Sequence, residues 1–94
     1  MTRNEKPYWV YILRCADGSL YTGITDDVER RAAAHNAGKG AKYTRGRGPV
    51  AVAYRELCPD KSAALRRELE IKKLSRAEKL LLIERWEREL LAEG

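Results

Sequence analysis

Tyr11 and Tyr21 are the first residues of this sequence whose type and spacing suggest chemistry. They lie ten residues apart, in two runs of β-branched and aromatic residues separated by an Asp-Gly turn. If a three-residue loop, residues 16–18, joins the runs, Tyr11 lies opposite Gly23 in a β-hairpin. Leu13 then lies opposite Tyr21 on the same face of the sheet. Gly23 would leave a hollow beside two phenols where a ligand backbone could approach; equally, tyrosines are common in strands without such a role.

Arg31 and His35 form a second pair of candidate residues, in the segment expected to be the first helix. Because they are four residues apart, their side chains share one helix face, one turn apart. The planar guanidinium of Arg31 could bind a phosphate through paired hydrogen bonds. His35 is the one histidine of the chain, which excludes a site built from several histidines. A partly exposed position near the C-terminus of the helix is the alternative interpretation of His35.

Glu68 is an acid on the apolar side of a helix expected over residues 61–74. On a helical wheel it falls on the same side as Ala64 and Ile71. Burying a carboxylate is costly unless the group is ion-paired or binds a metal. An ion pair with Lys72, four residues further on, is one explanation, and a bound metal ion is the other.

The elements that must position these residues follow from periodicity and turn residues. The predicted order is β-β-α-β-α-α, with strands over 8–13, 20–25 and 50–57 and helices over 26–38, 61–74 and 75–91. Residues 39–49 have no periodicity and are expected to form an exposed, mobile loop. Three strands cannot bury both faces of a sheet alone, so the helices must cover it in an α+β arrangement.

Each predicted helix has a start signal in the sequence. Two of them are capping boxes and the third is a single capping acid. In chain order they are Asp26 with Glu29, Asp60, and Ser75 with Glu78. The first helix also has an end signal, because Gly38 is a natural residue for the position just past a helix C-terminus.

Composition limits the chain to one domain, residues 1–94. With 44% hydrophobic and 35% charged residues it is neither a disordered tail nor a membrane protein, and no apolar run is long enough to span a bilayer. We find no signal-peptide pattern. Cys15 and Cys58 lack the CxxC spacing of a zinc site and offer at most one disulfide, which fits a cytoplasmic location.

The net charge of +5 is concentrated in one segment. Residues 29–48 contain six basic residues against a single acid, Glu29. A basic segment beside a glycine-rich loop favours a polyanionic partner such as nucleic acid. A solvated loop that only improves solubility is the other interpretation of the same charges.

Taken together, these residues resemble the GIY-YIG nuclease family. The shared features are Val10-Tyr11, a hairpin, Tyr21-Thr22-Gly23, Arg31 eight residues after that glycine, and a later helix with Glu68. The Gly-Lys-Gly-Ala-Lys-Tyr-Thr-Arg-Gly loop is similar to that of small, stand-alone bacterial members. The resemblance covers residues 7–85 and implies a three-stranded antiparallel sheet flanked by helices. Trp9 and Thr22 replace the glycine and isoleucine of the family name, changes that look common among small members.

The resemblance implies cleavage of DNA phosphodiester bonds with one divalent metal ion, Mg²⁺ or Mn²⁺. Tyr11 would be the general base or would activate the water, and Tyr21 would orient the water or the scissile phosphate. Arg31 would stabilise charge on the phosphoryl oxygens, His35 would support phosphate or proton transfer, and Glu68 would hold the metal. DNA contacts are expected at Gly23, Lys39, Lys42, Tyr43, Arg45, Arg47 and Lys72.

Two other functions fit the same sequence. The first is a nucleic-acid-binding module of this fold that does not cut, because family enzymes with defined targets gain specificity from an additional DNA-binding domain. A partner protein would then supply specificity, and branched or single-stranded DNA, or RNA, would be candidate substrates, as in DNA repair. The second is a protein-interaction domain that uses Trp86 and the leucines of the last helix, although core packing also explains these residues.

Overall fold

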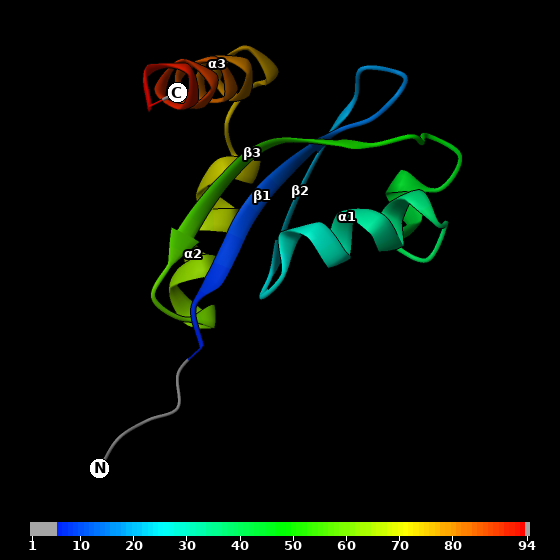
Figure 1. Ribbon diagram of the computed structural model, residues 1–94, viewed down its shortest axis with the longest axis horizontal. Coiled ribbons are helices and arrows are strands. Elements are labelled where there is room, and N and C mark those ends of the chain that lie inside the picture. The colour runs from blue at the N-terminus through cyan, green and yellow to red at the C-terminus, as the bar shows by residue number, and fades with distance from the viewer. Residues whose placement is uncertain (1–5, 94) are drawn as a thin grey trace.

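The computed structural model of the protein describes residues 6–93, so the expected domain, residues 1–94, extends beyond the described residues at both ends. The predicted element order is confirmed (Figure 1). The strands are β1 (Tyr8–Arg14), β2 (Leu20–Thr25) and β3 (Ala51–Cys58), and the helices are α1 (Val28–Asn36), α2 (Lys61–Lys72) and α3 (Arg76–Glu93). Within the described part of the chain, no helix is both long and apolar enough to cross a membrane.

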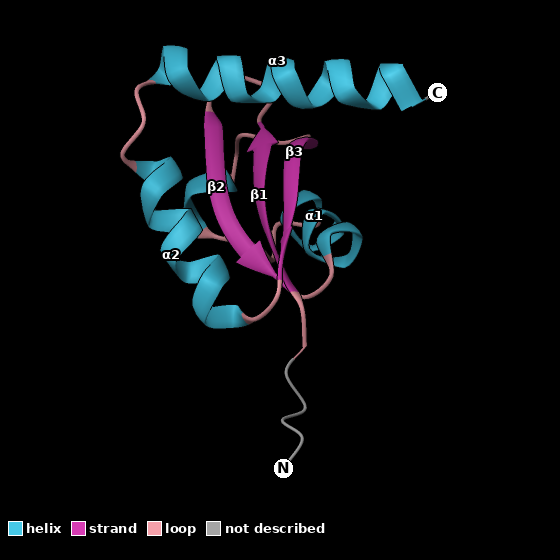
Figure 2. Cartoon of the chain, turned by 90° about the vertical axis from the view of Figure 1, so that its left-hand side faces the viewer, coloured by secondary structure: helices cyan, strands magenta, loops and turns pink. Residues whose placement is uncertain are grey.

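The three strands form one antiparallel sheet in the order β2-β1-β3. Figure 2 shows α2 on one side of this sheet and α1 on the other, with α3 lying across one end. The expected α+β class, an α/β sandwich with helices flanking a three-stranded sheet, is therefore confirmed. β2 and β3 are the edge strands of this sheet, and β1 is its central strand.

The hairpin has the register that the sequence predicts. Tyr11 pairs with Gly23 and Leu13 pairs with Tyr21. The backbone N–H of Cys15 donates to the carbonyl of Ser19 at 2.9 Å, which closes a loop of three residues. Gly18 supplies the positive φ of +85° that this loop requires. The three-residue loop therefore places Tyr11 opposite Gly23 and Tyr21 opposite Leu13.

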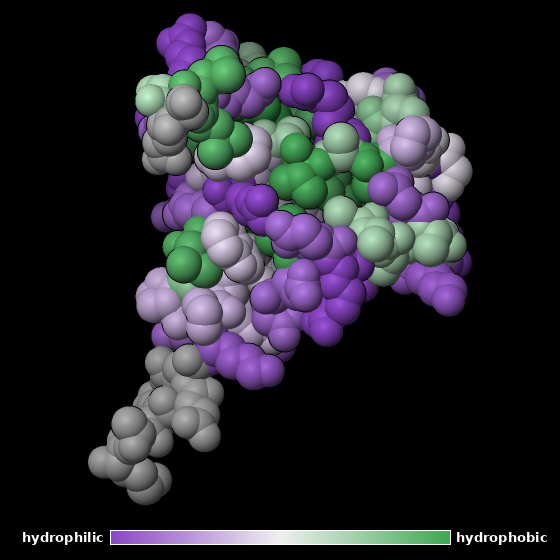
Figure 3. Space-filling view, in the orientation of Figure 1, coloured by the Kyte–Doolittle hydropathy of each residue, from purple (hydrophilic) through white to green (hydrophobic). Residues whose placement is uncertain are grey.

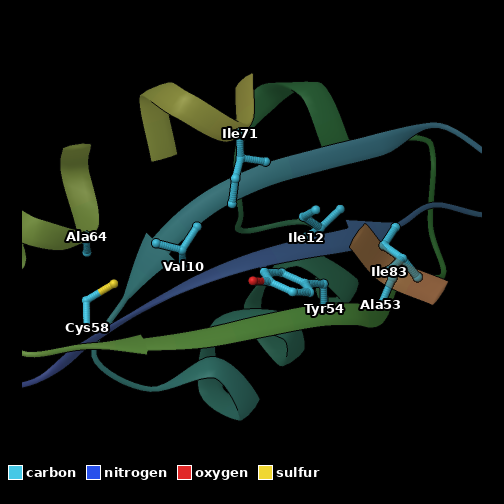
Figure 4. Close-up of a cluster of buried hydrophobic side chains, with 8 residues drawn as sticks. All are labelled: Val10, Ile12, Ala53, Tyr54, Cys58, Ala64, Ile71 and Ile83. Atoms are coloured by element: carbon cyan, nitrogen blue, oxygen red, sulfur yellow. The ribbon is translucent and has the colours of Figure 1, made fainter. Parts of the chain in front are cut away.

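β1 divides its side chains between two hydrophobic clusters. Val10 and Ile12 point toward α2 and α3, and Tyr11 and Leu13 point toward α1. All four side chains are at most 1% exposed. The first cluster, drawn in Figure 4, consists of Val10, Ile12, Ala53, Tyr54, Cys58, Ala64, Ile71 and Ile83. One face of the sheet thus forms most of the core, and the other contains Tyr11 and Tyr21.

The start of α1 differs from the prediction by one residue. The capping residue is Asp27, not Asp26, and its carboxylate accepts from the N–H of Arg30 at 3.0 Å. Asp26 instead forms an ion pair with the Arg30 guanidinium at 2.8 Å. The predicted capping box is absent because, with Asp27 as the cap, Glu29 is the second helical residue and a capping box needs an acid at the third. Glu29 accepts from Arg55 of β3 at 2.6 Å instead.

The other helix signals are confirmed. Asp60 accepts from the N–H of Ala63 at 2.8 Å. Ser75 and Glu78 form the predicted capping box, with reciprocal hydrogen bonds of 2.8 and 3.1 Å. After α1, Gly38 has a φ of +78°, as expected for a residue that ends a helix.

The loop over residues 39–49 is more ordered than its composition predicts. It contains a 3₁₀ turn, η1 (Lys42–Thr44), and Thr44 is only 1% exposed. The Arg47 carbonyl accepts from the N–H of Ala16 at 2.8 Å, and its guanidinium pairs with Asp17 at 2.7 Å. These contacts attach the loop to the hairpin turn, so the expectation of an exposed segment is wrong at its centre.

α3 is partly explained by core packing. Ile83 is 1% exposed, and the Trp86 ring meets the Tyr54 ring edge-on, with centroids 6.1 Å apart. Leu81 and Leu91 are exposed instead, and Figure 3 shows hydrophobic surface over the end of α3. α3 therefore packs on the core through Leu80, Leu82 and Ile83, while Leu81, Leu90 and Leu91 are exposed.

The corrected helix start predicts different costs for two adjacent acids. Asp27→Ala should lower the free energy of unfolding by about 1 kcal/mol, because a helix cap is lost. Asp26→Ala should cost about 0.5 kcal/mol or less, because it removes only an exposed ion pair between the residue before the cap and Arg30 of α1. Urea denaturation followed by circular dichroism measures both. The reverse order of costs would show that Asp26 is the cap.

Candidate active site

The centre of the candidate site is a buried chain of three polar side chains from three different elements. His35 of α1 is 2% exposed. Its Nδ1 lies 2.7 Å from Thr44 Oγ1, and its Nε2 lies 3.3 Å from the Tyr11 hydroxyl. Thr44 Oγ1 donates its own proton to the Ala41 carbonyl at 2.9 Å.

This network defines where the imidazole proton lies. Because the Thr44 hydroxyl proton is already used, Thr44 must accept a hydrogen bond, and His35 Nδ1 must carry the donating N–H. In the neutral ring, Nε2 then has a lone pair and accepts the Tyr11 O–H. Tyr11 is therefore a donor to His35.

His35 is buried, so the expectation of a partly exposed helix residue is wrong. Burial lowers the pKa of His35, and the positive charge of Arg31 lowers this pKa further. Both effects favour the neutral ring at pH 7. The Thr44 contact closes one side of the ring, which leaves Nε2 as the atom that faces Tyr11.

Tyr11 is a buried phenol with charged groups nearby. Burial is the main cause that raises the pKa of Tyr11; Tyr21 and the carboxylate of Glu68 raise it as well, and Arg31 lowers it. Arg31 and Glu68 therefore both lie close enough to act electrostatically on this hydroxyl. Tyr11, Tyr21, Arg31, His35 and Glu68, the five predicted catalytic residues, are brought to one region of the molecule.

Gly23 has a different role from the predicted one. A Cβ atom at this position would lie 2.7 Å from the Tyr11 hydroxyl oxygen and 3.1 Å from Cε2 of Tyr21. The expected hollow beside the phenols is filled by the Tyr11 ring itself, because the ring leans across its cross-strand partner. Gly23 thus makes space for a side chain of this protein, where the sequence suggested space for a ligand.

Gly40 is a residue of the site that the sequence interpretation missed. A Cβ here would lie 2.2 Å from His35 Nδ1 and 2.8 Å from His35 Cα. The chain after α1 therefore passes directly over the imidazole, and only glycine fits. The spacing of His35, Gly40 and Thr44 was visible in the sequence, but the basic composition of the loop indicated only a flexible segment.

Aromatic rings extend from the buried site to the surface. The Tyr21 ring lies 5.2 Å from the His35 ring and 6.4 Å from the Tyr11 ring, centroid to centroid. Tyr43 stacks on Tyr21 at 5.9 Å and is 44% exposed. The Arg47 guanidinium lies over the Tyr43 ring, 4.5 Å from its centroid. Tyr43 and Arg47 thus connect the basic loop to the site.

Glu68 forms the ion pair that is one of the two explanations the sequence left open. Its side chain is 15% exposed, and it pairs with Lys72 at 3.4 Å. The same carboxylate acts on the pKa of Tyr11, so the ion pair does not turn it away from the site. Across residues 6–93, the His, Cys, Asp and Glu side chains nowhere form a group of three that could hold a metal ion. A single carboxylate with several waters still suits Mg²⁺.

The predicted DNA-binding residues differ in exposure and pairing. Lys39, Lys42 and Arg45 are exposed on the loop. Arg47 is paired with Asp17, and Lys72 is paired with Glu68. The first three cations are therefore the ones most accessible to a polyanion.

The fold is a three-stranded antiparallel sheet flanked by helices, with Tyr11, Tyr21, Arg31, His35 and Glu68 in one region of the molecule. The family model described as the GIY-YIG catalytic domain matches residues 7–80. The chain belongs to the GIY-YIG family, a nuclease family.

Related proteins have the same small size. The chain is 58% identical over 77 residues to the UPF0213 protein SH2523 of Staphylococcus haemolyticus, which covers 82% of this chain and 94% of that protein. It is 60% identical over 70 residues to the UPF0213 protein VNG_2274C of Halobacterium salinarum, covering 74% and 91%. The solution structure of the UPF0213 protein BH0048 from Bacillus halodurans is similar with a TM-score of 0.54, at 52% identity over 83% of each chain.

The close packing at Gly23 predicts a cost for one added methyl group. Gly23→Ala should lower the free energy of unfolding by about 1–3 kcal/mol, because Tyr11 is buried and cannot move away. Gly48→Ala is the matched control, since its methyl group would meet only Asn36 Oδ1, at 3.8 Å. Chemical denaturation of both variants measures the difference. Equal stability of the two would contradict the packing of Tyr11 on Gly23.

Proposed function

We propose that the protein is a divalent-metal-dependent endonuclease that hydrolyses DNA phosphodiester bonds as a single domain in the cytoplasm. The observation that carries the proposal is the hydrogen bond between Tyr11 and the neutral, buried His35. In a member of a nuclease family, this bond pairs a phenol with a base that can accept its proton.

Tyr11 and His35 would act together on the attacking water. A phenol with a raised pKa is a poor base alone, so Tyr11 needs a place to send its proton. As Tyr11 takes a proton from water, its own proton would pass to His35 Nε2. Thr44 would hold the imidazole in the tautomer that permits this transfer. Tyr21, packed against His35, would orient the water or the phosphate.

Arg31 and Glu68 would supply the charge that phosphoryl transfer requires. The Arg31 guanidinium would stabilise charge on the phosphoryl oxygens, where a planar donor pair fits best. Glu68 would hold one Mg²⁺ or Mn²⁺ with water as the remaining ligands. Such a metal ion neutralises charge on the leaving group. Lys72 would release Glu68 and contact DNA instead.

The basic loop would hold the DNA backbone next to this site. Lys39, Lys42 and Arg45 would contact phosphates. Tyr43, which stacks on Tyr21 and lies beneath the Arg47 guanidinium, would extend the DNA contact from the loop to Tyr21. Gly23 would contribute indirectly by accommodating Tyr11. The substrate would be branched or single-stranded DNA, as in DNA repair, and RNA is a further candidate. A partner protein would supply specificity, because the chain is a single small domain.

A nucleic-acid-binding module that does not cut is the second candidate. The Glu68–Lys72 ion pair favours it, because a paired carboxylate must lose its partner before it can hold a metal. In this case the basic loop would bind and the tyrosines would be structural.

A cleavage assay distinguishes these candidates. Supercoiled, linear, single-stranded and branched DNA would each be incubated with Mg²⁺, Mn²⁺ or EDTA. The unmodified protein should cut at least one of them with metal and none with EDTA. Glu68→Gln and Arg31→Gln should each reduce the rate at least about 100-fold, because each removes charge needed in the transition state.

Glu87→Gln is the control, because it neutralises an exposed acid of α3. It should cut at the unmodified rate. If the unmodified protein, Glu68→Gln and Arg31→Gln all bind DNA equally and none cuts, the protein is a binding module.

A further inference from the structure

A pocket opens beside the candidate site, at the end of the sheet away from the hairpin loop. Its volume is about 500 Å³, and its lining includes Tyr8, Asp26, Arg30, Arg31 and Lys61. These residues come from the start of β1, the start of α1 and its preceding turn, and the first residue of α2. Of these residues, only Arg31 is a candidate functional residue in the sequence.

The charge in this pocket favours an anion. Three cations line it against one carboxylate. Asp26 pairs with Arg30 at 2.8 Å, which holds that guanidinium at the pocket, where its side chain is still 70% exposed. Lys61 Nζ lies 5.9 Å from the centroid of the Tyr8 ring. A cation over an aromatic ring gives the pocket both a charged and an apolar wall.

The pocket is continuous with the candidate active site because Arg31 belongs to both. Tyr8 precedes Tyr11 by three residues of β1, about 10 Å along the strand. The Tyr8 side chain lies on the opposite face of the sheet from Tyr11. A nucleic acid strand with its scissile phosphate at Arg31 would therefore reach Tyr8 across the end of the edge strand β2, where Ile24 and Thr25 also line the pocket. A volume of about 500 Å³ is in the range of small-ligand pockets.

We propose that this pocket binds the nucleotide that flanks the scissile phosphate, with its phosphate on Arg30 and Lys61 and its sugar or base against Tyr8. The inference rests on the proposed function, since it takes a nucleic acid strand as the ligand. The cleaved strand would then run from the basic loop, past Tyr11, to the end of β2 that lies away from the hairpin loop.

Two double variants with equal charge changes test the pocket. Arg30→Gln/Lys61→Gln removes its two unassigned cations. Arg66→Gln/Arg88→Gln is the control: Arg66 is exposed on α2, and Arg88 forms an ion pair with Glu84 with the same spacing as Arg30 with Asp26. Binding of a fluorescein-labelled, single-stranded 12-nucleotide DNA would be measured by anisotropy in EDTA, over a series of salt concentrations.

The pocket variant should bind about ten-fold more weakly than the control variant. Its slope of log affinity against log salt should fall by about 0.7, the value for losing one phosphate contact on a single strand. Equal binding by the two variants would overturn the proposal, and so would an absence of binding by the unmodified protein.

Cleavage by the same proteins with Mg²⁺ separates this inference from the proposed function. If the unmodified protein does not cut but the pocket variant loses affinity, the pocket stands as a nucleotide-binding site and the nuclease proposal fails. If the unmodified protein cuts and both variants have the same KM, the pocket fails and the nuclease proposal stands. If both hold, the pocket variant should raise KM about ten-fold and leave kcat nearly unchanged, because Arg30 and Lys61 do not touch the reacting atoms.

Discussion

A single buried imidazole connects three separate parts of this chain. His35 lies on α1, Tyr11 on the central strand and Thr44 in the loop that follows the helix, and both ring nitrogens are hydrogen-bonded. Burial makes a charged ring costly here, so the neutral form is favoured, and a neutral ring needs one donor and one acceptor as partners. This requirement sets the position of the loop as well as the direction of the Tyr11 hydroxyl.

Close packing makes the arrangement possible. Gly40 lets the loop backbone lie against the imidazole, and Gly23 lets the Tyr11 ring lie across β2. β1 contributes to both sides of the sheet, because its alternate side chains form the core beneath α2 and the site beneath α1. Stability and chemistry therefore depend on the same strand, and a substitution of Tyr11 affects both. Readouts of folding must accompany any measurement of activity at this residue.

The sequence predicts the sheet better than it predicts the site. The hairpin register follows from loop length because strand side chains alternate with a period of two, and the caps of α2 and α3 follow from single residues. The sequence predicts the start of α1 one residue early, because Asp26 and Asp27 are both good capping residues and the spacing from Asp26 to Glu29 favours the wrong one. Composition also concealed the buried Thr44 inside a loop that is otherwise basic and rich in glycine.

The tautomer of His35 is the most direct test of this account, and nitrogen NMR of the chain's one imidazole measures it. At pH 7 the account predicts a neutral ring with the proton on Nδ1, and a pKa below the ordinary value of 6.5. Because the folded-state pKa is lowered, stability from the neutral ring is present above pH 6.5 and is lost as the pH falls toward the folded pKa. A ring protonated on Nε2 at pH 7, or a pKa above 6.5, would contradict a neutral His35 that accepts the Tyr11 O–H, the arrangement on which the proposed chemistry depends.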